Sequence, residues 1–148
     1  MPIYECLTVE GTLTGEQRRQ IAEAITTIHA EETGAPADLI HVIFPELPAG
    51  HAYTAGRESR PALIRGQVRA GRPPEVRQAI LRRIYDVYAG VTETDAADGM
   101  GILVAVIDVP AKWVMEAGRI LPEPDKADED AWFAELHAST EPPRRASN

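Results

Sequence analysis

Hydrophobic positions follow a strand pattern and then a helical pattern at the start of the chain. Residues 3–9 are predicted to form a first strand. The next apolar positions, Ile21, Ile25 and Ile28, recur at helical spacing. They predict a helix from about Gly15 to Thr33 with one apolar face.

Signals at both ends of this helix support its limits. Thr14–Gln17 is a capping-box pattern, and Gly34 is a natural helix stop. The short apolar run Leu39–Phe44 then predicts a buried strand. A long loop follows over Pro45–Pro61, with a possible short strand near residues 52–54. Loops of this length in compact domains are often functional.

The same order of elements recurs in the second half. Residues 62–68 read as a strand, and Pro73 and Pro74 mark a helix start, because proline suits the first turn. Residues 101–107 form another buried strand. The apolar stripe of the second helix is formed by Val76, Ile80, Ile84 and Val87.

The two halves can be overlaid with a constant shift of 62 positions. The matched pairs are Ile40 with Ile102, Val42 with Val104, Glu46 with Asp108, Pro48 with Pro110 and Ala49 with Ala111. This favours an old duplication and an α/β (α+β) fold. Two consecutive β-α-β units would form a four-stranded sheet with two helices on one face. Because the other face lacks a cover, we expect a symmetric oligomer.

The end of the chain differs from both units. We expect one domain over residues 1–121 and an acidic extension over residues 122–148, partly docked and then disordered from residue 138. The residues expected to dock are Trp132, Phe133 and Leu136.

Composition limits the function classes. The chain of 148 residues has a net charge of −8, which argues against nucleic acid as a partner. It contains no apolar run of 18 residues and no signal-peptide pattern, so no membrane partner is expected. The single Cys6 excludes an intrachain disulfide and fits the reducing cytoplasm.

Pro2 is the first candidate for chemistry. Methionine aminopeptidases usually remove Met1 before a small residue, which would leave Pro2 as a free secondary amine. A free α-amino group titrates at roughly 7.7–8.0, close enough to neutrality for acid–base catalysis. Pro2 could equally do no more than begin a strand.

Charged residues elsewhere suggest a binding site for an anion. Arg69 and Arg72 lie at the end of the third strand and before the second helix, where ligands of α/β sheets bind. Two guanidinium groups there would clamp a carboxylate, although solvated surface arginines would show the same spacing. His29 lies near the end of the first helix, where a buried structural histidine is the simpler reading. Glu116, in a fairly apolar stretch, is either a water-activating base or an exposed acid.

These residues together resemble the tautomerase superfamily, and more closely the cis-3-chloroacrylic acid dehalogenase group. The matching segments are Pro2 at a strand start, Thr14 and Gly34 around a helix that ends near His29, Leu47–Gly50, Arg69–Arg72, Pro110–Ala111, Met115–Pro122 and Trp132–Phe133. The resemblance implies a fold of two β-α-β units assembled as a homotrimer. It also implies that no cofactor is needed. His41, His51 and His137 show no metal-ligand spacing with His29, so no metal site is expected.

The resemblance also implies roles for single residues. Pro2 would match the catalytic proline, Arg69 and Arg72 the pair that binds the substrate carboxylate, and His29 a residue that assists them. Glu116 would match the acid that activates water.

One position departs from the pattern. The dehalogenases carry a tyrosine in the fourth strand, where this chain has Ala105. Another tyrosine would have to compensate, and the candidates are Tyr4, Tyr53, Tyr85 and Tyr88.

Ala105 separates the possible reactions. The methyl group of Ala105 cannot hydrogen-bond the water molecule that hydration or dehalogenation needs, whereas tautomerisation needs no water. We therefore expect enol–keto tautomerisation of small 2-oxo carboxylic acids as the main activity. Hydration or dehalogenation of cis-3-haloacrylate-like acids is the alternative. A non-catalytic oligomeric scaffold of the same fold is the second alternative.

Overall fold

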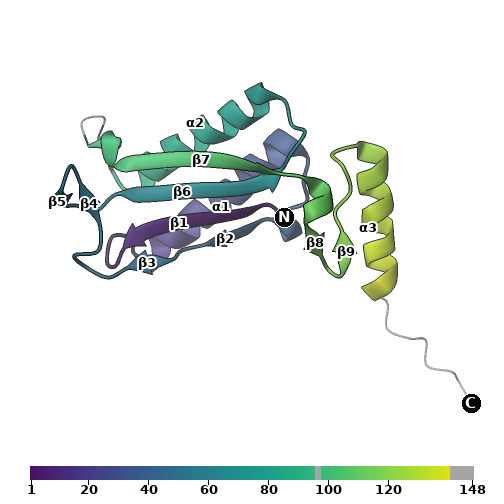
Figure 1. Ribbon diagram of the computed structural model, residues 1–148, viewed down its shortest axis with the longest axis horizontal. Coiled ribbons are helices and arrows are strands. Elements are labelled where there is room, and N and C mark those ends of the chain that lie inside the picture. Colours follow the sequence, from purple (N-terminus) through teal and green to yellow (C-terminus); the bar gives the residue numbers. More distant parts are fainter. Residues whose placement is uncertain (96–97, 141–148) are drawn as a thin grey trace, which may run out of the picture.

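The computed structural model describes residues 1–95 and 98–140 of the chain (Figure 1). Its strands are β1 (Ile3–Val9), β2 (His41–Ile43), β3 (Glu46–Leu47), β4 (Tyr53–Thr54), β5 (Arg57–Glu58), β6 (Ala62–Arg69), β7 (Ile102–Val109), β8 (Met115–Glu116) and β9 (Arg119–Ile120). Its α-helices are α1 (Gly15–Thr33), α2 (Pro74–Val91) and α3 (Lys126–Thr140). Short 3-10 turns are η1 (Ala37–Leu39), η2 (Gly99–Gly101) and η3 (Ala111–Trp113).

The main sheet has the strand order β2-β1-β6-β7, and β3 adds to β1 beyond β2. β1 pairs with β2 and β6 pairs with β7 in parallel, whereas β1 and β6 run antiparallel. Each parallel pair is joined through a helix, so two β-α-β units meet along β1 and β6. The fold class expected from the sequence is therefore confirmed.

Helices α1 and α2 lie side by side on one face of the sheet (Figure 1). The hydroxyl of Thr14 accepts a hydrogen bond from the N–H of Gln17 over 3.1 Å, and the side chain of Gln17 bonds the backbone of Thr14. Gly34 ends α1 in the left-handed region at φ 73°. The core between helices and sheet includes Tyr4, Cys6, Ile21, Ile25, Ile64, Ile80 and Ile84.

Two predicted strand boundaries were wrong. The strand expected over Leu39–Phe44 covers only His41–Ile43, because Leu39 closes the turn η1 and Pro45 lacks an N–H for the ladder. In the loop between Pro45 and Pro61, the short strand expected near residues 52–54 is present as β4, and β3 and β5 were not expected. The last long strand runs from Ile102 to Val109, and Gly101 belongs to η2.

The carboxyl-terminal segment packs at the end of the sheet where the N-terminus lies (Figure 1). Trp132 is 8% exposed and packs with Ala111 and Leu121, with Phe133 and Leu136 around them. The expectation of disorder from residue 138 was wrong for residues 138–140, which continue α3. The rest of that expectation concerns residues 141–148, which lie outside the described residues.

The face of the sheet opposite α1 and α2 carries exposed apolar side chains. Ile43, Leu103 and Ile107 are 42%, 54% and 48% exposed. An open apolar sheet face of this kind is the feature from which an oligomer was expected.

Within residues 1–95 and 98–140, no helix is long and apolar enough to cross a membrane.

Candidate functional site

Pro2 is fully buried at the start of β1. Its carbonyl oxygen accepts a hydrogen bond from the backbone N–H of His41 over 3.0 Å. The next pair of residues, Ile3 and His41, begins the ladder between β1 and β2. Met1 precedes Pro2 in the structure, so the proline nitrogen is here part of a peptide bond.

Glu116 faces the N-terminus from a small hairpin formed by β8 and β9. Ala117 and Gly118 turn this hairpin in the left-handed region, at φ 51° and φ 76°. One carboxylate oxygen of Glu116 pairs with the N-terminal amine of Met1. The other lies 3.1 Å from Nε2 of His41. The structure therefore brings the candidate acid to the N-terminus, although the two are far apart in the sequence.

Arg69 and Arg72 project from the end of β6 and the turn that follows it. Gly71 has φ 99°, a backbone conformation that suits glycine, and it turns the chain between the two arginines. Arg69 donates a hydrogen bond to the carbonyl of Pro122 over 2.8 Å, and Arg72 donates to that of Thr33 over 2.7 Å. Backbone acceptors on two different segments thus hold both guanidinium groups in place.

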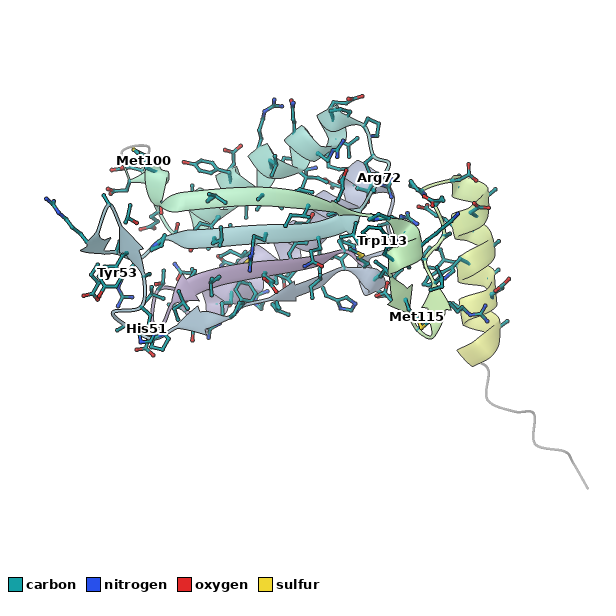
Figure 2. All side chains as sticks on the ribbon, viewed as in Figure 1. His51, Tyr53, Arg72, Met100, Trp113 and Met115 are labelled. Atoms are coloured by element: carbon teal, nitrogen blue, oxygen red, sulfur yellow. The ribbon has the colours of Figure 1, made fainter. Side chains whose placement is uncertain are left out.

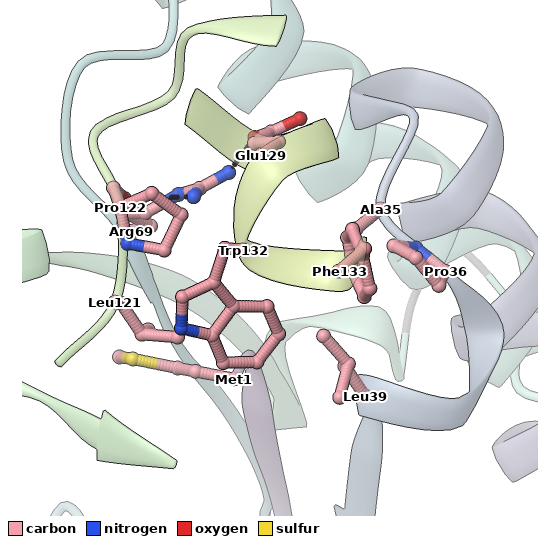
Figure 3. A pocket seen from close by; sticks show the side chains of 10 residues that line it. All are labelled: Met1, Ala35, Pro36, Leu39, Arg69, Leu121, Pro122, Glu129, Trp132 and Phe133. Carbon is pink, nitrogen blue, oxygen red and sulfur yellow. Dashed lines mark hydrogen bonds and ion pairs between the residues drawn. The ribbon is translucent and has the colours of Figure 1, made fainter. Parts of the chain in front are cut away.

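Both arginines contact one carboxylate, that of Glu129 on α3. Figure 3 shows the contact with Arg69. Glu129 forms a close ion pair with Arg69, and one of its oxygens lies 3.6 Å from Nη2 of Arg72. Burial and the neighbouring Arg69 lower the pKa of Arg72, while Glu129 opposes that shift. The arginine pair therefore holds a carboxylate in this structure, supplied by the chain itself.

His29 is 5% exposed on α1, and its Nδ1 lies 2.8 Å from the hydroxyl of Tyr4. Burial lowers the pKa of His29 to about 4, and the charges of Arg72, the N-terminal amine and Arg69 act in the same direction. The imidazole is therefore neutral at pH 7. Gly66, the partner of Tyr4 across β1 and β6, leaves room for the phenol ring, because a Cβ there would overlap it.

Met1 lies between three cavities. Two small ones, of about 30 Å³ and 20 Å³, lie toward the arginines, and Arg69 lines both. The third, of about 230 Å³, lies toward Glu116 and His41. Because Met1 lines all three, its removal would join the arginine side of the site to the Glu116 side. The first cavity is lined by Met1, Ala35, Pro36, Leu39, Arg69, Leu121, Pro122, Glu129, Trp132 and Phe133 (Figure 3).

Ala105 is not part of this arrangement. It lies on β7, paired with Arg65 of β6, and is absent from the residues that line the three cavities. Of the tyrosines considered as substitutes, Tyr4 reaches the site through His29. Tyr53, 62% exposed, lies at the opposite end of the sheet (Figure 2).

Sequence reasoning missed two residues of the site. His41 and Glu129 contact Glu116 and the arginines, respectively. Neither lies in a motif, and only the packing of β2 and α3 brings them there. Among the described residues, no three His, Cys, Asp or Glu side chains are grouped as metal ligands would be.

A family model described as "Putative oxalocrotonate tautomerase enzyme" matches residues 1–137. A probable tautomerase, LL0574, from Lactococcus lactis subsp. lactis (strain IL1403) is 43% identical over 56 residues. That alignment covers 38% of this chain and 90% of the relative.

Solved structures extend the likeness to nearly the whole chain. Native Ps01740 is 56% identical, with a TM-score of 0.74, over 77% of this chain and 99% of its own. The structure called N1, a member of the cis-3-chloroacrylic acid dehalogenase family, is 32% identical with a TM-score of 0.82. Here the match covers 95% of this chain and 92% of the other. The resemblance inferred from the sequence is confirmed.

Proposed function

The chain belongs to the family of putative oxalocrotonate tautomerase enzymes, and from this premise we propose that it catalyses enol–keto tautomerisation of small 2-oxo carboxylic acids. One observation supports this most: the N-terminus lies between Glu116 and a pair of arginines that already holds a carboxylate. The proposal requires that Met1 be removed, because only a free Pro2 nitrogen can carry a proton.

Pro2 is the proton carrier in this proposal. Its nitrogen takes the proton from the enol hydroxyl of the substrate and returns it to the far carbon of the enol double bond, while the carbon that carried the hydroxyl becomes the ketone, so the reaction is an isomerisation. Burial of the proline ring and the hydrogen bond from His41 to its carbonyl hold the nitrogen in one position. Removal of Met1 also empties the space between the cavities, which makes room for a substrate.

Arg69 and Arg72 bind the carboxylate of the substrate, in the place where Glu129 lies now. A bidentate guanidinium contact suits this role because it fixes orientation as well as charge. Neutral His29 accepts the hydrogen bond of Tyr4 on Nδ1, which leaves its Nε2–H as a donor toward the substrate. In this arrangement the substrate displaces an internal carboxylate rather than water alone.

The test compares the processed wild-type chain with P2A in a phenylenolpyruvate ketonisation assay. Alanine at position 2 also permits removal of Met1, so both proteins begin with a free amine, confirmed by mass spectrometry. We expect P2A to lose most of the activity, since a primary amine on a flexible residue replaces a fixed secondary one. Equal rates for the two proteins would reject the proposal.

Hydration or dehalogenation of cis-3-haloacrylate-like acids is the second candidate. The position of Glu116 beside the N-terminus favours it, because after removal of Met1 a neighbouring carboxylate would stabilise the charged Pro2 amine that must deliver a proton to carbon. Halide release from cis-3-bromoacrylate measures this activity directly. Faster halide release than ketonisation, lost in E116Q, would make this the main function.

We also propose that the active form is a cytoplasmic homotrimer. The apolar side chains Ile43, Leu103 and Ile107 are exposed on the sheet face that α1 and α2 leave open. The chain shares its fold with fused 4-OT, whose structures are described as trimers, with a TM-score of 0.72 at 20% identity. If the isolated protein retains Met1 and lacks both activities, a non-catalytic scaffold remains as the third reading.

A further inference from the structure

The side chain of His41 has no role in the proposed reaction so far, although it contacts the candidate acid directly. Its Nε2 lies 3.1 Å from Oε1 of Glu116, while the N-terminal amine pairs with Oε2 of the same carboxylate. The two oxygens therefore have separate partners on separate elements. A carboxylate with a partner on each oxygen cannot rotate freely about its terminal bond without losing one of them.

The backbone of His41 also holds Pro2. Its N–H donates to the carbonyl oxygen of Pro2 over 3.0 Å, next to the first pair of the ladder between β1 and β2. His41 thus contacts the carbonyl of Pro2 through its backbone and the carboxylate of Glu116 through its side chain.

Exposure supports a role for this contact in the site. The side chain of Glu116 is 18% exposed, and that of His41 is 54% exposed. Both line the cavity of about 230 Å³ on the far side of Met1 from the arginines. Glu116 is therefore largely removed from water, and hydrogen-bond donors to a carboxylate gain strength in such surroundings.

We propose that His41 is a positioning residue for Glu116. Its Nε2–H donates to one carboxylate oxygen, so that the other oxygen faces the nitrogen of Pro2 once Met1 has been removed. This inference rests on the second candidate function, hydration or dehalogenation, since that reaction needs Pro2 and Glu116 to act together. A half-exposed histidine that merely pairs with an acid on the surface would contribute little to the stability of the fold or to the reaction rate.

The test uses H41L and H41Q of the processed chain. Leucine removes the donor at similar size, whereas glutamine retains an N–H that can reach the carboxylate. We expect H41L to lower kcat for halide release from cis-3-bromoacrylate about tenfold, in line with the loss of a hydrogen bond to a charged group. KM should stay within about twofold, because the arginines bind the substrate. H41Q should recover most of kcat.

The split between kcat and KM, together with the recovery in H41Q, separates positioning from a purely structural effect. The control is H51L, since His51 is exposed at the opposite end of the sheet (Figure 2). H51L should match the wild type in every measurement.

The outcomes also distinguish this inference from the function on which it rests. An inactive P2A beside an H41L with wild-type kcat would reject the role of His41 alone. An H41Q as impaired as H41L would reject it too, because the donor would then be irrelevant. An active P2A would reject the proposed function first.

Discussion

The hydroxyl of Tyr4 lies 2.8 Å from Nδ1 of His29, and both side chains are buried between the sheet and α1. Burial, together with Arg72, the N-terminal amine and Arg69, lowers the pKa of His29 from 6.5 to about 4. This pair joins the core of the protein to its candidate site, and it makes the stability of the fold depend on pH.

The folded chain should lose stability as the pH falls from about 6.5 toward 4. In this range the unfolded chain binds a proton on His29, whereas the folded chain resists it. The contribution is fully present above pH 6.5, and the loss amounts to about 3 kcal/mol once the pH is below both values. Urea unfolding at several pH values measures it. H29Q should lack this component, and an identical pH dependence in H29Q would contradict the assignment.

Gly66→Ala should destabilise the fold by about 1–3 kcal/mol, because the new methyl group would overlap the ring of Tyr4. The matched control is Gly90→Ala on α2, where a Cβ meets nothing within 4 Å. That control should leave stability unchanged or slightly higher, since alanine favours a helix. Thermal unfolding of both variants measures the difference. Equal stability of Gly66→Ala and wild type would show that the ring of Tyr4 can adopt another position without cost.

Arg72→Ala should lower kcat/KM at least tenfold, because the substrate carboxylate loses a charged hydrogen-bond donor. One such hydrogen bond contributes binding free energy equal to about a tenfold change or more. Arg83→Ala is the control, since Arg83 pairs with Glu31 and Glu32 away from the site. Steady-state ketonisation rates measure both variants. If the two behave alike, Arg72 does not bind the substrate.

Glu129→Gln should lower KM for a carboxylate substrate several-fold with little change in kcat. The internal carboxylate competes with the substrate for Arg69 and Arg72, and a neutral amide competes less well. Asp130→Asn is the control on the same helix, because Asp130 pairs with the exposed Lys126 instead. A raised KM in Glu129→Gln would mean that Glu129 positions the two arginines for the substrate rather than competing with it.

Ile107→Glu should disrupt the oligomer, because a charge on the open sheet face cannot be buried between subunits without a partner. Sedimentation at micromolar protein should give three chains for the wild type and fewer for the variant. Met100→Glu is the control, since Met100 is 96% exposed beside the sheet. A wild type that sediments as a monomer would reject the proposed trimer.

Both helices of the tandem units could be predicted from local signals. The capping box at Thr14, the left-handed Gly34 and the two prolines at the start of α2 act over three or four residues, so the sequence alone carries them. The predicted strand over Leu39–Phe44 was too long, because apolar residues continue past the point where hydrogen bonding to β1 ends. An apolar run indicates that residues are buried, but a buried residue need not be hydrogen-bonded to a neighbouring strand. The ends of the strand therefore cannot be taken from the ends of the apolar run.

Pro2, Arg69, Arg72, His29 and Glu116 were chosen from the sequence, and the structure places them around the N-terminus. Local chemistry and a family pattern were enough to select them. His41 and Glu129 could not be found that way, because each enters the site through contacts with residues more than fifty positions away. Such contacts depend on the pairing of β2 with β1 and on the packing of α3, and these are decided by the energy of the whole fold.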